Sequence, residues 1–242
     1  MLTEVPAGVV IVIALAVLVG SYVQAVVGLG VGLVTAPVVA VVEPSLMPTL
    51  PLLFGLLVSG LSLAGERRHV DWPAVGWTLP ARIPGTIVGI VLVLAFTPSQ
   101  LGIAVALVVL AAVLLSVWSI RLPVNRHTLL AAGFTSGVTG TATSIGGPPL
   151  ALLFQHRRPS EVRATLAVFF VLGVVLSLTG FAITGSIPRD SLVVAAVVSP
   201  LLLLGIWLGT RTRGRLPRDG FRVAVLVVCA ASAVVLLVRS LG

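Results

Sequence analysis

The sequence contains the glycine-rich stretch Gly28-Leu29-Gly30-Val31-Gly32 inside a long apolar run, with Pro37 five residues further on. A second stretch of this kind extends from Gly140 to Pro149 and reads Gly-Thr-Ala-Thr-Ser-Ile-Gly-Gly-Pro-Pro. When Gly140 is aligned with Gly28, Pro149 falls on Pro37. Because glycine and proline both interrupt helices, each stretch predicts a helix broken within its apolar run. Two broken helices at matching positions favour a membrane transporter built from two repeats.

The composition places nearly the whole chain in lipid. Of its 242 residues, 58% are hydrophobic and 9% are charged, and the mean hydropathy is +1.20. Average proteins carry about 25% charged residues, so this deficit argues against a soluble protein. Fifteen arginines against seven acids give a net charge of +8, and most of these arginines lie between apolar runs. We therefore expect an all-α, multi-pass membrane protein whose arginines set its orientation in the lipid bilayer and bind no nucleic acid.

Six apolar segments are long enough to cross a bilayer once, and they cover residues 46–65, 73–96, 99–120, 162–184, 190–210 and 219–239. The remaining apolar segments form two pairs, at 6–42 and 128–155. In each pair a helix leads to a glycine-rich break and a shorter helix of about 11 residues follows, which is ~16 Å at 1.5 Å per residue. That length is about half the thickness of the bilayer core, so the second helix either completes the crossing or turns back.

The arginines indicate what happens in the second pair. If 128–155 turns back, both of its ends lie on one side of the membrane. The loops on that side then collect twelve arginines, and Arg189 and Arg239 lie on the opposite side. If it crosses, the arginines divide eight against six. Because cytoplasmic loops are enriched in arginine, the first arrangement is favoured. We expect a re-entrant hairpin at 128–155 that opens to the cytoplasm.

Landmark residues repeat between the two halves of the chain. Pro84 and Gly89 match Pro200 and Gly205 at a constant separation of 116 positions. The sequence therefore predicts a single transmembrane domain made of two repeats, which cover residues 1–122 and 123–242.

Each repeat is expected to contain one hairpin and three spans. Charges do not decide whether the first hairpin, 6–42, turns back or crosses, and the repeat favours turning back. Because three spans is an odd number, the second repeat is then inverted relative to the first. Inverted repeats with broken helices are the recurring plan of secondary transporters.

Together these motifs resemble a known family. The paired breaks are each followed by proline and a helix, and a short charged loop reads Val70-Asp71-Trp72. The spans 73–96 and 190–210 carry Pro84-Gly85 and Pro200 with Gly205. This combination resembles the TauE/SafE sulfite exporter family over almost the whole chain. The resemblance implies export of a small sulfur-containing anion, such as sulfite or an organosulfonate like sulfoacetate, across a bacterial or archaeal cytoplasmic membrane.

The two breaks are the predicted substrate site. Backbone N–H groups at a helix start lack internal partners and carry partial positive charge, so an anion is stabilised there. Glycine allows an anion to approach the backbone closely, and neighbouring hydroxyl and amide groups replace its hydration. The predicted substrate-binding residues are Gln24, Gly28, Gly30, Gly32, Thr35, Thr141, Thr143, Ser144, Gly146 and Gly147, together with Arg82, which is discussed next. The alternative is that Gly28 and Gly32 only allow close helix packing, as a small-xxx-small pair, and that Gln24 forms an interhelical hydrogen bond.

Arg82 is the arginine predicted to lie deep inside a span. It follows Asp71 by eleven positions, which is ~16 Å of helical rise, and Pro80 and Pro84 flank it. A charge at that depth costs at least ~2.5 kcal/mol on insertion scales. Since no acidic residue lies within an apolar segment, a bound anion is one way to offset this cost. Snorkelling to the interface, or bonding to carbonyls freed by the prolines, is the other.

The same features limit the mechanism. The expected function is secondary transport by alternating access, with no cofactor and no metal site. A passive anion channel, a transporter of a non-sulfur carboxylate and a structural partner subunit remain alternatives, whereas a membrane enzyme is disfavoured because buried acid, base and nucleophile groups are missing. Sodium or proton coupling is left open, although a proton relay has no Asp, Glu or His in mid-membrane. A homo-oligomer is also left open.

Overall fold

The computed structural model describes residues 5–27, 30–117, 122–212 and 218–241. Within these ranges the chain forms ten α-helices and two 3-10 turns, and no strand. The helices are α1 (Ala7–Val27), α2 (Val31–Val42), α3 (Thr49–Glu66), α4 (Trp72–Ala95), α5 (Pro98–Val117), α6 (Arg126–Thr143), α7 (Gly147–Phe154), α8 (Pro159–Ile183), α9 (Arg189–Thr212) and α10 (Arg218–Leu241). The 3-10 turns are η1 (Pro44–Leu46) and η2 (Arg67–His69).

Five of these helices are long and apolar enough to span a membrane, namely α1, α4, α5, α8 and α9. The apolar part of α3, Thr49–Gly65, falls slightly short of that length, and only Cys229–Leu241 of α10 could be assessed as an apolar helix. Exposed side chains along these helices include many large apolar ones, for example Ile83, Ile87 and Val91 on α4, as expected of surfaces that face lipid. The prediction of an all-α, multi-pass membrane protein is confirmed at this level.

Local sequence explains where the helices begin. The side chain of Asp71 accepts a hydrogen bond from the N–H of Ala74 and caps α4, and Asn125 caps α6 in a reciprocal capping box with Thr128. A proline at the first helical position starts α8. The shorter helices after the two breaks are 12 and 8 residues long, so the second is shorter than the sequence suggested.

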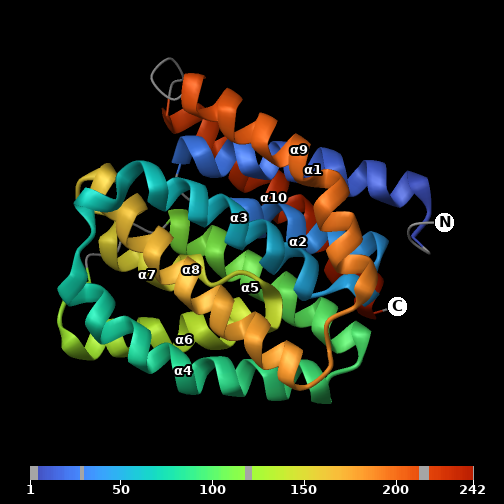
Figure 1. Ribbon diagram of the computed structural model, residues 1–242, viewed down its shortest axis with the longest axis horizontal. Coiled ribbons are helices and arrows are strands. Elements are labelled where there is room, and N and C mark those ends of the chain that lie inside the picture. Colours follow the sequence, from blue (N-terminus) through green and yellow to red (C-terminus); the bar gives the residue numbers. More distant parts are fainter. Residues whose placement is uncertain (1–4, 28–29, 118–121, 213–217, 242) are drawn as a thin grey trace.

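The chain reverses direction at both breaks. A Cβ on Gly20 of α1 would lie 3.2 Å from Cα of Val31, the first residue of α2. In a continuous helix these two residues would be ~16 Å apart. In the second pair, the hydroxyl of Ser136 in α6 donates to the carbonyl of Gly146, ten residues later. Both pairs are therefore hairpins, in which α2 folds back along α1 and α7 folds back towards the start of α6 (Figure 1).

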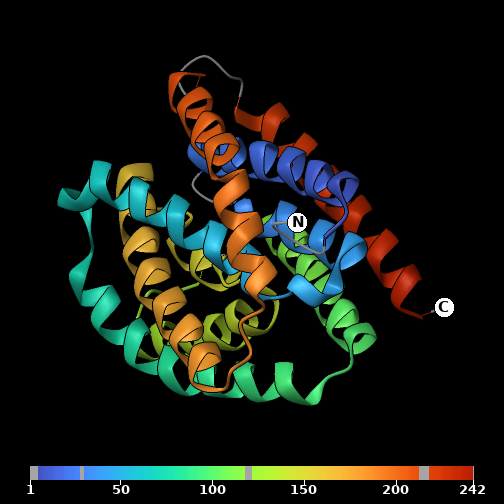
Figure 2. The same ribbon diagram turned by 45° about the vertical axis from the view of Figure 1, so that its right-hand side comes forward.

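Two helix pairs pack closely and run parallel (Figures 1 and 2). Gly133 of α6 lies against Thr78 of α4, and further along both helices Gly137 lies against Arg82. The pair α1 and α9 follows the same rule, because Gly205 lies against Ser21 and Gly209 against Ala25. In both pairs a glycine removes the side chain that would separate the two backbones.

These directions define two ends of the molecule. The starts of α4 and α6 lie at one end, and a hydrogen bond of 3.0 Å between the N–H of Asp71 and the hydroxyl of Thr165 brings the first turns of α8 there too. We call this the arginine-rich end, because it holds Arg67, Arg68, Arg126, Arg157 and Arg158. The start of α9, with Arg189, shares the opposite end with the start of α1.

Candidate functional site

The two helix breaks meet in the interior. A Cβ on Gly32, in the first turn of α2, would overlap the carbonyl oxygen of Ser144, the residue that ends α6. The Ser144 hydroxyl donates to the carbonyl of Pro48 at 2.8 Å and so ties this break to the start of α3. Only glycine at position 32 permits this approach.

Gln24 holds the first break. Its Oε1 accepts a hydrogen bond of 3.0 Å from the N–H of Val31, the first residue of α2. Gly30, which precedes it, has φ 156° and ψ −33°, a conformation that residues with a Cβ rarely adopt. The N–H groups of Gly32 and Leu33 belong to the first helical turn and have no carbonyl four residues earlier within the helix.

Ser136 holds the second break in the equivalent way. It follows Gln24 by 112 positions, the same separation that relates Gly140 to Gly28, and it bonds Gly146 just before α7 begins. The αL conformation of Ser144, with φ 63°, ends α6. Because Pro148 and Pro149 have no N–H, α7 offers fewer backbone donors than α2.

Arg82 reaches the point where the breaks meet. It extends from α4 between Gly140 of α6 and Gly173 of α8. A Cβ on Gly173 would overlap the Arg82 guanidinium, and a Cβ on Gly140 would lie 3.3 Å from its Nη2. Two glycines on two different helices thus make room for one side chain.

The Arg82 side chain is buried without an anionic partner. It is 1% exposed, so it does not snorkel to the surface. Its Nε and Nη1 have no hydrogen-bond partner among the described residues, which also means that they do not bind the carbonyls freed by Pro80 and Pro84. Its guanidinium carbon lies 4.5 Å from the ring centroid of Phe169. A desolvated cation–π contact of this kind offsets about 2 kcal/mol of the cost of burying the charge. It does not use the N–H groups of the guanidinium, so these donors are left for a further partner.

A cavity of about 60 Å³ lies beside Arg82, and we call it the central cavity. One water occupies about 10–15 Å³ on this measure, so the cavity has room for several waters or one small oxyanion. Among the described residues, no acidic side chain lines it. Its lining residues of interest are Gln24, Gly30, Gly32, Leu33, Arg82, Gly140, Ser144, Gly146 and Gly147.

The central cavity brings together seven of the predicted site residues, from four helices and both breaks. Three others do not line it: the hydroxyl of Thr35 bonds Val31 O, that of Thr143 bonds Thr139 O, and that of Thr141 pairs with Ser177 at 2.8 Å. Gly28 lies outside the described residues.

The sequence reasoning missed two walls of the central cavity. Gly55 and Ser59 of α3 contribute one wall, and Phe170 and Val174 of α8 contribute another. The signal for α3 was present as small residues four positions apart, on one helix face. No pattern in α8 marks Gly173 as the residue that accommodates Arg82, since this requires knowing that α4 and α8 are in contact.

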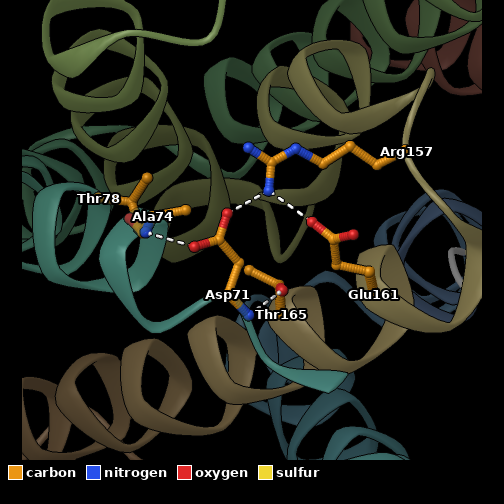
Figure 3. Close-up of polar contacts among 6 residues, drawn as sticks. All are labelled: Asp71, Ala74, Thr78, Arg157, Glu161 and Thr165. Carbon is orange, nitrogen blue, oxygen red and sulfur yellow. Dashed lines mark hydrogen bonds and ion pairs between the residues drawn. The ribbon is translucent and has the colours of Figure 1, made fainter.

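An ion-pair cluster fixes the start of α4 at the arginine-rich end (Figure 3). Nη1 of Arg157, in the turn between α7 and α8, binds the carboxylates of Asp71 and, at 2.6 Å, Glu161. Burial acts to lower the pKa of Arg157, but hydrogen bonds and charge interactions with Asp71 and Glu161 outweigh it and raise the pKa. The cluster joins the end of the second hairpin to the helix that carries Arg82.

The sequence profile of the family "Sulfite exporter TauE/SafE" matches residues 12–236, which is almost the entire chain. The chain belongs to the TauE/SafE family. The probable sulfite/organosulfonate exporter TauE of Cupriavidus necator is 28% identical to it over 204 residues, which cover 79% of each chain. No solved structure matches the chain.

Membership in the TauE/SafE family confirms two predictions. The family consists of exporters, so the chain is a membrane transport protein and not an enzyme. It also removes a structural partner subunit from the alternatives. The described residues contain no group of three or more His, Cys, Asp or Glu that would suit a metal ion.

Proposed function

We propose that this protein exports a small sulfur-containing oxyanion across the cytoplasmic membrane by alternating access, with the anion held in the central cavity. The observation that carries the proposal is Arg82, a buried cation whose Nε and Nη1 are unbonded, beside a cavity whose described lining contains no acidic group. The first-turn amides of Gly32 and Leu33 supply further donors. The relative in Cupriavidus necator, by its name a sulfite/organosulfonate exporter, supports the substrate class.

We further propose that the two halves of the chain are inverted repeats in the membrane, with the arginine-rich end in the cytoplasm. The helix pairing supports this, because exchanging the halves converts the pair α4 with α6 into the pair α9 with α1. The same exchange matches α2 with α3 to α7 with α8. An inside-negative potential then drives an anion outward, by ~2.3 kcal/mol per charge per 100 mV.

Binding to purified protein tests the site. Sulfite, sulfate, thiosulfate, sulfoacetate and acetate are titrated against the wild type, Arg82→Met and the exposed control Arg189→Met. We expect Arg82→Met to weaken the best sulfur anion by about 100-fold, ~2.7 kcal/mol, because it removes the charged donor and leaves the anion buried without it. The thermal stability of anion-free Arg82→Met should not fall, since the buried charge has no partner to lose. Unchanged affinity would reject the proposed site, and acetate as the best ligand would favour the carboxylate alternative.

Counterflow in proteoliposomes separates a transporter from a channel. Vesicles loaded with unlabelled sulfite should transiently accumulate labelled sulfite, because a carrier exchanges one anion for another across the membrane. A passive channel gives no such overshoot. The result expected here is an overshoot that disappears in Arg82→Met.

A further inference from the structure

Two more cavities lie between the central cavity and the arginine-rich end. A narrow cavity of about 10 Å³ shares Gln24, Ser59 and Phe170 with the central cavity. An outer cavity of about 280 Å³ shares Arg163 with the narrow one. The three cavities therefore follow one another, and Arg163 stands at the junction of the outer two.

The outer cavity is lined by the ends of helices that lie at the arginine-rich end. Its described lining includes Leu115 and Ser116 of α5, Gln155 after α7, and Arg157 and Arg163 as the charged side chains. Arg163, one turn into α8 and half-buried, lines both the outer and the narrow cavity, whereas Arg157 lines only the outer one.

One face of α3 makes the narrow cavity polar. Gly55, Ser59 and Ser62 follow one another at intervals of four and three residues, so they share a helix face. Ser59 and Ser62 line the narrow cavity opposite Arg163 and Phe170 of α8, and Gly55 and Ser59 line the central cavity. Small and hydroxyl side chains thus extend without interruption from Arg163 towards Arg82.

A second connection is apolar. The outer and central cavities also share Leu33 and Pro148, neither of which has a side chain that hydrogen-bonds an anion. An oxyanion that leaves water needs replacement donors at each stage, because a buried ion without them costs several kcal/mol. On the other route, Ser59 lines both the central and the narrow cavity. The Ser62 hydroxyl donates to the carbonyl of Val58 at 2.9 Å, so it turns from that carbonyl when it serves an anion.

We propose that Arg163, Ser62 and Ser59 form an outer anion site, through which the substrate passes between the arginine-rich end and Arg82. The inference rests on the proposed function, since it takes the same class of small oxyanion. The narrow cavity holds about one water, so it is too small for an oxyanion in this structure. Passage requires Phe170 of α8 and the serine face of α3 to separate.

Arg163→Gln tests the outer site, with Arg158→Gln as the matched control. Arg158 lies five residues earlier, is exposed and lines none of the three cavities. Sulfite uptake into everted membrane vesicles, whose cytoplasmic face is outside, is measured below saturation and at several salt concentrations. We expect Arg163→Gln to lower the initial rate by about tenfold and to flatten its salt dependence, because the charge attracts and passes on the anion. Equilibrium affinity should stay within about twofold of the wild type.

Ser62→Leu provides a second test that leaves every charge in place. Leucine fills the narrow cavity without altering a residue of the central cavity, so uptake should fall strongly while sulfite affinity is retained. If Arg163→Gln and Ser62→Leu both took up sulfite at the wild-type rate, the outer site would be rejected and passage would be assigned to the side of Leu33 and Pro148. Loss of binding in Arg163→Gln, equal to that in Arg82→Met, would also overturn it. If wild-type protein bound no sulfur anion, the proposed function itself would fail.

Discussion

Arg82 shows how one residue sets the energy balance of the site. Its burial costs at least ~2.5 kcal/mol on insertion scales, and the Phe169 ring at 4.5 Å offsets only part of this cost. Replacing water around a guanidinium with an aromatic face leaves its N–H donors without acceptors. An anion in the central cavity supplies those acceptors, so the same feature that destabilises the anion-free protein strengthens binding.

Gly173→Ala should impair binding although Gly173 contributes no polar side-chain group. The new methyl group would overlap the Arg82 guanidinium, which must then turn away from the central cavity. We expect sulfite affinity to fall by about tenfold, ~1.4 kcal/mol, in a titration of the purified variant. Gly180→Ala, on the same helix, is the control, because its methyl group would meet only the flexible end of Ile90. Equal affinity in both variants would show that the position of Arg82 does not depend on Gly173.

At the scale of elements, each break is held by a polar side chain from the helix that precedes it. Gln24 bonds the first amide of α2, and Ser136 bonds the carbonyl of Gly146. These bonds fix the turns inside an apolar surrounding, where an unpaired backbone group costs about 1–3 kcal/mol. The ion-pair cluster also fixes a helix, but it acts at the start of α4 and not at a break within an apolar run.

Asp71 contributes to stability in two ways, as the cap of α4 and as an ion-pair partner of Arg157. Different substitutions separate the two. Asp71→Asn keeps an acceptor for the Ala74 N–H but removes the charge that binds Arg157. Because these side chains are 17% and 29% exposed, we expect their coupling to be about 1 kcal/mol or less. Asp71→Ala also loses the cap, at a cost of about 1 kcal/mol more. The free energy of unfolding by SDS in mixed micelles measures the cap and the ion pair. A double-mutant cycle with Arg157→Ala isolates the ion pair. A coupling of zero in that cycle would show that the ion pair adds no stability.

At the scale of the whole molecule, helix direction agrees with arginine distribution. The parallel pairs α4 with α6 and α1 with α9 place the loops before α4 and α6 at one end and the loop before α9 at the other. The first group of loops carries Arg67, Arg68 and Arg126, whereas the loop before α9 carries Arg189. An arginine-rich end of this kind is typical of the cytoplasmic side.

Single-cysteine labelling tests this topology in a Cys229→Ala background, since Cys229 is the only cysteine. His127→Cys and His156→Cys are expected to react with a membrane-impermeant reagent from the cytoplasmic side. Ser99→Cys and Thr184→Cys should react from the opposite side. All four native residues are exposed, so each site is accessible without unfolding. Labelling of positions 127 and 156 from opposite sides would contradict the hairpin at α6 and α7.

Much of the fold follows from local sequence. Apolar runs place most helix starts close to those observed, because span length depends on nearby residues. The short helix α7 was predicted too long mainly at its start, because Ile145 and Gly146 belong to the break and the helix begins only at Gly147. Seven residues of the predicted substrate site line the central cavity. The two breaks and Arg82, on which that prediction depended, are visible as exceptions in an apolar sequence.

The sequence by itself determined that this protein is a multi-pass helical membrane protein with two broken helices and an arginine deep inside a span, since composition and the positions of glycine, proline and arginine depend only on the chain. Only the tertiary structure decided that the breaks touch, that Gly140 and Gly173 make room for Arg82, and that α3 and α8 complete the cavity. These features arise from contacts between helices far apart in sequence. Packing in lipid depends on close fit between small residues, and apolar periodicity carries little information about which small residues meet.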